Sequence, residues 1–250
     1  MKLKYVALIL IFCSAIAVAA YVAQPYIAER WYLKGLFSGD QELEGETIDK
    51  LGEVGQEAAY EVLLARFLDY APGMFFVRTG TQPARAMRWV EIWPHTATEP
   101  KGLWTMRKVI DAQATIAKRL GKRRMVDFGI RELKNTSAGL RVRVFFAQYF
   151  ALVISERHPE EFIALEWKDA KKSDGVEYQI VKNARPEVLQ ICMLALKSDD
   201  VYCRATACYT LGLVGTREEA LPSLKEAQSD ARFEVREIAS EAIEALAGSP

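Results

Sequence analysis

The chain begins with a long apolar stretch. Residues 5–23 read YVALILIFCSAIAVAAYVA and carry no charge, whereas Lys2 and Lys4 precede them. As a helix this segment would be about 28 Å long, close to the thickness of the hydrocarbon core of a bilayer. We therefore expect a transmembrane signal-anchor helix over 5–23, after a short basic terminus over 1–4. A cleaved secretory signal ending at the AVA of 17–19 and a buried core helix are the alternatives.

Near the carboxyl end, apolar residues recur at helical spacing. Arg204 and Arg236 are 32 residues apart, and a period of this length is typical of stacked helical hairpins. We expect Gly212 and Gly215 to lie in the turn between two helices with a positive φ. The three apolar faces comprise Val201, Ala205, Cys208 and Leu211, then Ala220, Leu221, Leu224 and Ala227, then Val235, Ile238, Ala239, Ala242 and Leu246.

These residues resemble the HEAT-repeat family, in the short bacterial form that phycobilisome lyases also contain. That form has a D-x-x-V-R start, an A-x-x-A-L-G-x-[LI]-G centre and an A-[LV]-P-x-L second helix. The matching residues are Arg204, Arg236, Leu211, Gly212, Gly215, Leu221, Pro222, Ser223 and Leu224. The resemblance is clearest over 199–247 and weaker over 38–68. It implies an all-α fold of the α-solenoid type.

The resemblance also implies a structural role for the two arginines. In this family the arginine pairs with acids of adjacent repeats and forms a ladder. Asp200 and Asp230 are the natural partners of Arg204 and Arg236 here. Such pairs position the hairpins more than they stabilise them.

The middle of the chain departs from the repeat pattern. Six prolines and glycines interrupt its first thirty residues, so we expect an irregular insertion over about 70–102. Helices are predicted over 103–120, 142–154 and 185–197. The second of these is almost wholly apolar but too short to cross a bilayer, and it is predicted to be the central buried helix. Residues 176–182 are compatible with a strand or a loop. The helical-repeat domain is predicted to extend over 24–250.

Composition narrows the function classes. Lys plus Arg equals Asp plus Glu at 33 each, so no global field attracts nucleic acid. The sequence contains two histidines and no P-loop, nucleophile elbow, zinc-protease or dinucleotide motif. We therefore expect no enzyme activity, no cofactor, no metal and no small-molecule substrate.

The cysteines allow two interpretations. Cys13 lies in the apolar leader after Phe12, where a lipoprotein signal requires a small residue, so lipidation is rejected. Cys192, Cys203 and Cys208 lie on two consecutive predicted helices. They are small buried thiols of the core, or two of them form one disulfide in an oxidising compartment.

Two groups of residues are candidate contact surfaces. Trp89, Trp93 and Trp104 are aromatic and therefore suited to a protein interface, although core packing is an equally good interpretation. The basic run over 118–124 ends a predicted helix. Solvation and contact with the helix carboxyl end explain it most simply, with anionic lipid or an acidic partner as the alternative.

The sequence as a whole predicts a membrane-anchored scaffold or adaptor that binds an unidentified protein. The short positive amino terminus favours a cytoplasmic N-terminus, with the main domain on the extracytoplasmic side. A periplasmic or secreted protein is the outcome if the leader is cleaved. A tetrapyrrole- or bilin-processing factor and a structural subunit of a membrane complex are the alternative functions.

Overall fold

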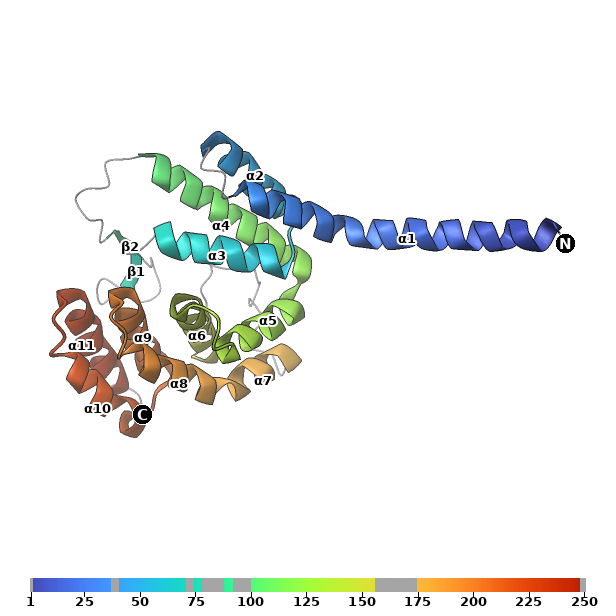
Figure 1. Cartoon of the computed structure of the whole chain (residues 1–250). Helices are drawn as coiled ribbons and strands as arrows, with labels where there is room; N and C mark the ends of the chain where they lie inside the picture. Colours follow the sequence, from blue (N-terminus) through green and yellow to red (C-terminus); the bar gives the residue numbers. More distant parts are fainter. Residues whose placement is uncertain are drawn as a thin grey trace.

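The structure is a computed structural model that describes residues 2–36, 41–70, 74–77, 88–91, 100–155 and 175–247. Helices dominate it, so the helical class expected from the sequence is confirmed (Figure 1). The helices are α1 (Lys2–Gly35), α2 (Gln41–Val54), α3 (Glu57–Tyr70), α4 (Pro100–Leu120), α5 (Lys122–Lys134), α6 (Leu140–Ile154), α7 (Val176–Asn183), α8 (Arg185–Ala195), α9 (Val201–Val214), α10 (Arg217–Ala227) and α11 (Phe233–Ala247).

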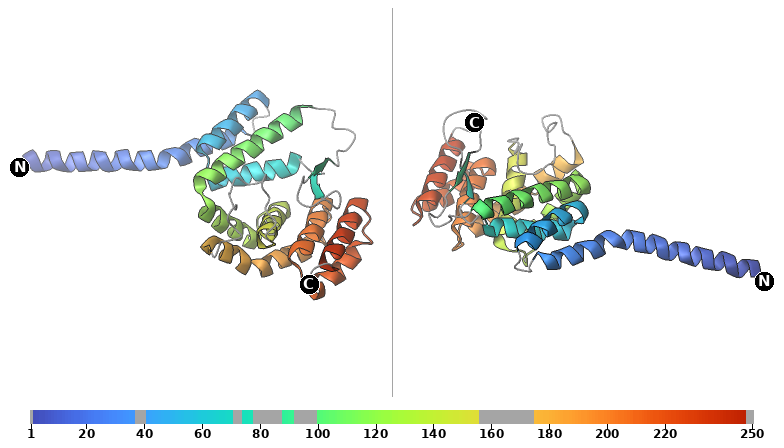
Figure 2. Two further views of the ribbon diagram at one scale, coloured as in Figure 1. Left: turned by 180° about the vertical axis from the view of Figure 1, so that it is seen from behind. Right: turned by 90° about the horizontal axis from the view of Figure 1, so that it is seen from above.

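Helix α1 is a long rod that projects from the rest of the molecule (Figures 1 and 2). It has 34 residues and continues through Pro25 to Gly35, well beyond the end of the apolar stretch at residue 23. Within the part of the chain that the structure describes, no helix is both long and apolar enough to cross a membrane. Most side chains of residues 5–23 lie outside the described ones, so the transmembrane segment stays a prediction.

The other helices follow one another along a curved path. In Figure 1, α2, α3 and α4 form the upper part, α5 and α6 lie below them, and α7 to α11 continue along the lower edge and up the left side. Helix α9 packs between α6 and α11, and α2 packs against α4. Figure 2 shows the same order from behind and from above. Helices that are separated by one or two others in the sequence are therefore neighbours in space.

Helix α6 lies at the centre of this path, as its apolar sequence predicts. Val142 and all ten residues from Val144 to Val153 are buried. Its Phe146 ring meets the edge of Phe128 from α5 at 5.4 Å between centroids, and Phe128 meets Tyr60 of α3 at 5.8 Å. These edge-to-face contacts join three helices into one core.

Two expectations about secondary structure were wrong. The insertion contains a two-stranded antiparallel hairpin, β1 (Met74–Val77) and β2 (Arg88–Glu91), where irregular chain was expected. Both strands are rich in aromatic and β-branched residues, which favour extended chain. Residues 176–183 form α7 instead of a strand or loop, because burial of Val181 against the core outweighs the β propensity of its valines and isoleucine.

The glycines of the C-terminal repeat also differ from expectation. Gly215 has a φ of −71°, and Gly212 lies inside α9. A Cβ at Gly212 would lie 2.8 Å from the Cβ of Ala242 and 2.9 Å from its Cα. Glycine is needed here because α9 and α11 approach closely, and not because a turn requires a left-handed backbone.

Candidate functional site

A repeated arginine contact joins the C-terminal helices. The Arg204 guanidinium donates from Nε to Asp230 Oδ2 at 2.7 Å and from Nη2 to Oδ1 at 3.1 Å. Its Nη1 also donates to the backbone carbonyls of Ser198 and Asp199, at 2.8 and 3.0 Å. Arg236 makes the same backbone contacts 32 residues later, with Asp230 and Ala231 at 2.7 and 3.0 Å. The period seen in the sequence is therefore also a period in hydrogen bonding.

The partner of Asp200 is a residue that the sequence analysis missed. Asp200 caps the first turn of α9, where its Oδ1 accepts from the Tyr202 N–H at 2.9 Å. Its Oδ2 accepts from Arg141 on α6, and not from Arg204 or Arg236 as the ladder implied. Arg141 also donates to the Leu68 carbonyl of α3, at 3.0 Å. The arginine–aspartate series thus extends from α6 through α9 to α11.

These contacts set the charge state of the two aspartates. Burial raises the pKa of Asp230, but hydrogen bonds from Arg204 and from the Arg232 N–H outweigh burial and leave the pKa below its ordinary value. Asp200 behaves in the same way, with Arg141 as the main opposing partner. Both carboxylates are ionised at neutral pH and act as anchors for guanidinium groups.

The three cysteines are core residues. Cys192 on α8 and Cys203 and Cys208 on α9 are buried and free in the structure. Burial raises the pKa of Cys203 and of Cys208 to about 12, and it also raises that of Cys192. A thiol with such a pKa is protonated at neutral pH and is a poor nucleophile. Of the two interpretations, the structure shows the buried thiols and not the disulfide.

The structure does not bring the three candidate tryptophans together as a described cluster. Trp89 lies on β2, opposite Phe76 of β1. Trp104 lies in the first turns of α4, but its side chain is outside the described residues, as is Trp93 altogether. An interface built on these tryptophans stays a prediction.

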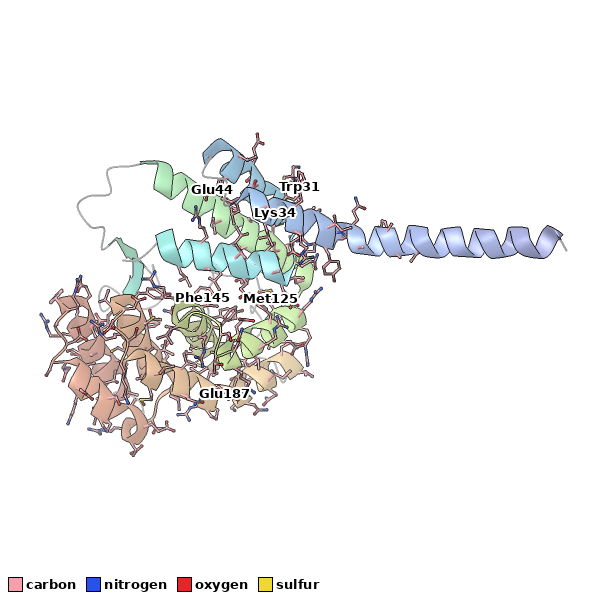
Figure 3. All side chains as sticks on the ribbon, viewed as in Figure 1. Trp31, Lys34, Glu44, Met125, Phe145 and Glu187 are labelled. Atoms are coloured by element: carbon pink, nitrogen blue, oxygen red, sulfur yellow. The ribbon has the colours of Figure 1, made fainter. Side chains whose placement is uncertain are left out.

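A more clearly defined apolar surface lies on α1. Tyr21, Ile27 and Trp31 are 77, 67 and 75 % exposed, and Ile27 and Trp31 are four residues apart, which places them on one side of the helix. Figure 3 shows Trp31 at the place where α1 meets the body. A shallow groove of about 590 Å³ follows this side of the helix. Its lining comes from α1 alone, namely Ala20, Tyr21, Gln24, Ile27, Ala28, Trp31 and Tyr32.

A buried carboxylate ties α1 to the body. The side chain of Glu29 is almost fully buried, and its Oε1 accepts from the N–H groups of Gln56 and Ala59 at 2.7 and 2.8 Å. These N–H groups begin α3 and would otherwise lack an acceptor in the helix. The negative charge also suits the positive end of the α3 dipole. The attachment of α1 is therefore a helix cap supplied from a distant segment.

Arginines of α4 and α5 complete this junction. Arg119 donates to the carbonyls of Gly52, Glu53 and Gly55, which end α2. Arg124 donates to Glu57 at 2.7 Å, and this bond raises the arginine pKa most. Tyr26 of α1 raises the pKa of Arg124 further, as a smaller cause than Glu57. The carboxyl-terminal half of α1 is therefore in contact with α2 and α3.

The site consists of contact surfaces and not of converging acid, base and nucleophile among the side chains described above. Sequence reasoning missed Glu29 and Arg141, and it did not connect Arg119 of the basic run with α2, because each acts on a segment more than 25 residues away. It also overlooked Tyr21 and Trp31, although aromatic residues at the end of an apolar stretch or just beyond it are a readable signal. No protein-family model matches the chain, and no curated protein matches it either.

Proposed function

We propose that the protein is a membrane-anchored helical-repeat adaptor, an α-solenoid that binds a protein partner on the extracytoplasmic side. The first part of α1 spans the bilayer and holds the body at its surface. The observation that carries the proposal is the group of exposed apolar side chains of Tyr21, Ile27 and Trp31 on α1, which lie at the end of 19 uncharged residues and just beyond it. Moving a side chain such as Trp31 out of water lowers its free energy. Exposed apolar side chains of this kind therefore favour an apolar or interfacial environment.

The stacking of the body supports the adaptor role. Helices α6, α9 and α11 pack side by side, and the links from Arg141 to Asp200 and from Arg204 to Asp230 recur between them. Repeats that contact only their neighbours create an extended surface, which suits a protein or peptide ligand. Leu194 on α8 is 48 % exposed and provides an apolar contact point on this surface.

The membrane part of the proposal is tested with the full chain in cells. Membranes are washed with alkaline carbonate, which releases peripheral proteins, and we expect the chain to remain in the pellet. In the variant Ile9→Arg/Ile16→Arg each arginine costs about 2.5–3.5 kcal/mol at the centre of a span, so the variant should be released. The substitution pair Ile238→Val/Ile243→Val, outside the span, serves as the control. Release of the wild-type chain, or a shortened amino terminus, would contradict an uncleaved anchor.

The partner is sought by photo-crosslinking in intact cells. Photoreactive residues replace Gln190 and Leu194 of α8 and Lys225 of α10, which are exposed on second helices. Asp111 of α4 is exposed too and provides the control position. We expect one protein to be captured from the second helices and not from position 111. Equal capture from all four positions would contradict a specific binding surface.

The same preparation separates the alternatives. A structural subunit would leave detergent in a stable complex of fixed stoichiometry, whereas an adaptor exchanges its partner. A tetrapyrrole-processing factor would bind a bilin and show the visible absorbance of that pigment. The resemblance to lyase repeats is what motivates this second check.

A further inference from the structure

The groove of α1 opens on the side of the helix that faces away from the body. Glu29 is buried against the start of α3, which defines the side of α1 that faces the body. Ile27 and Trp31 line the groove, and each lies two residues from Glu29, a rotation of about 200° around an α-helix. In Figures 1 and 2, none of the other helices and strands that the structure describes lies beside the first part of α1.

This side of α1 has the spacing of a coiled-coil contact. Counting back from Trp31, residues recur at alternating intervals of four and three as far as residue 6, and all but one of them are apolar or small. The series is Trp31, Ile27, Gln24, Ala20, Ala17, Cys13, Leu10 and Val6, and we call it the seam. The next position after Trp31 is Lys34, whose charge ends the series. Such a repeat is typical of helices that pack against each other along their length.

A second copy of the chain suits the seam better than lipid does. The groove is lined by the last four seam residues, and Gln24 lies in the middle of them. A single polar amide at such a position fixes the register of paired helices, because the amides of the two copies can hydrogen-bond to each other. Facing lipid, the same amide would lack a partner, which is costly. The small side chain of Ala20 allows two helix backbones to approach closely.

The seam is long enough for a stable dimer. Over residues 6–31, about 16 residues of each copy would lie at the contact or beside it, four in every seven. At roughly 30–40 Å² for each residue, the two copies would bury about 1,000–1,200 Å² in total, the size that a specific interface requires. The body lies on the opposite side of α1 and therefore does not obstruct a second helix in the groove.

We propose that α1 pairs with α1 of a second copy, so that the protein is a parallel dimer with its two bodies on opposite sides of a central helix pair. The parallel direction rests on the proposed function, because two anchors of the same topology point the same way in one membrane. The dimer displays two copies of the surface of second helices, so a partner with two binding segments would be held by both.

The test is disulfide crosslinking of the full chain in isolated membranes, in a Cys13→Ser background that removes the thiol of the seam. Ala20→Cys places a new thiol in the groove. Ala19→Cys, also at an exposed position, places it one residue away and outside the groove. Under mild oxidation we expect the covalent dimer to form roughly tenfold faster through position 20, because a disulfide requires β-carbons about 4 Å apart.

A matched pair of charge substitutions tests whether the groove holds the two copies together. Added to the Ala20→Cys chain, Ile27→Glu opposes two like charges in the groove and should slow crosslinking by about fivefold or more. Tyr26→Glu adds the same charge at the adjacent residue, which is 51 % exposed and does not line the groove. This control should leave the rate of crosslinking unchanged.

The outcomes separate the dimer from the anchor. Equal rates at positions 19 and 20, in chains that stay in the carbonate-washed pellet, would overturn the dimer and leave the anchor in place. Crosslinking of position 20 to a protein of different mass, or no crosslinking at either position, would also overturn it, because a partner or lipid then covers the groove. A chain released from the pellet that still crosslinks only through position 20 would support the dimer and contradict the anchor.

Discussion

The two ends of the body contain similar helix pairs that are held together by different contacts. In α2 the Gly55 N–H donates to the Leu51 carbonyl at 2.7 Å, and in α9 the Gly215 N–H donates to Leu211 at 2.8 Å. Each helix then packs against the next first helix, α4 or α11. At the carboxyl end, the hydrogen bond from Arg204 to Asp230 joins the two neighbouring repeats, and we call this contact the C-terminal lock. At the amino end, Glu29 of α1 and Arg119 of α4 fix the turn between α2 and α3.

The difference shows which repeats depend on a segment outside themselves. The C-terminal pair contains both partners of the Arg204–Asp230 bond, 26 residues apart, and the bond from Arg141 of α6 to Asp200 adds a link to a helix outside the pair. The N-terminal pair takes its cap from α1, so α1 is part of that repeat's structure. The four predictions below test this comparison, with the largest expected effect first.

Glu29→Ala should destabilise the N-terminal helices selectively. It removes the acceptor of one buried and one partly buried N–H group, and the loss should be about 3 kcal/mol. Hydrogen exchange read by mass spectrometry should show faster exchange in α2 and α3 and unchanged exchange in α9 and α11. Glu46→Ala, at an exposed position of α2, is the control. A uniform effect on both ends would refute the dependence of one end on α1.

Gly212→Ala should destabilise the C-terminal helix pair more than Gly52→Ala destabilises the N-terminal pair. The new Cβ at 212 meets the Ala242 backbone at 2.9 Å, whereas at 52 the nearest Ala112 atoms are 3.2 Å away. Overpacking outweighs the gain in helix propensity at 212 and should cost about 2 kcal/mol net, with a cost near zero at 52. Thermal unfolding measures both, and Gly139→Ala, which meets no atom within 4 Å, is the control. Equal shifts for all three would contradict the close approach.

Asp230→Asn should weaken the C-terminal pair and flatten its pH dependence. The folded-state pKa of Asp230 is below its ordinary value of 3.8. Its contribution is therefore complete above about pH 5 and is lost as the pH falls towards the folded pKa. The neutral side chain should cost about 1.5 kcal/mol at pH 7, and urea titrations at pH 7 and pH 3 measure both effects. Asp199→Asn, at an exposed neighbour, should keep the acid sensitivity of the wild type.

Arg119→Lys and Arg236→Lys should have the smallest effects, and similar ones. Both arginines donate to backbone carbonyls at a helix boundary, a geometry that a single ammonium group satisfies less well. We expect a loss of about 1 kcal/mol in each case, measured by urea denaturation. A much larger loss of stability for Arg119→Lys would mean that the turn between α2 and α3 depends on Arg119 more than on Glu29.

Local patterns predicted the parts of the fold that depend on neighbouring residues. The 32-residue period placed Arg204 and Arg236 in equivalent positions, and the apolar run predicted the buried helix over 142–154. The hairpin of β1 and β2 was missed because prolines and glycines around it dominated the pattern. The helix at 176–183 was missed because tertiary burial of Val181 decides it.

The candidate site was harder to predict, for a physical reason. Glu29 and Arg141 act on backbone groups and carboxylates that only the folded chain brings close. Their own sequence surroundings contain no periodic partner. The ladder expected for Asp200 was wrong in its donor for the same reason, since Arg141 arrives from a helix outside the recognised repeats.

The continuity of α1 has a mechanical consequence. Its 34 residues make a rod about 51 Å long, and Glu29 fastens one end to α3 with no loop between. In a bilayer, a tilt of about 20° would swing one end of such a rod sideways by roughly 17 Å relative to the other. A flexible linker would absorb that swing, whereas this rigid lever transmits it. Because helix tilt depends on membrane thickness, a change in thickness would then change the height and the angle of the body above the bilayer.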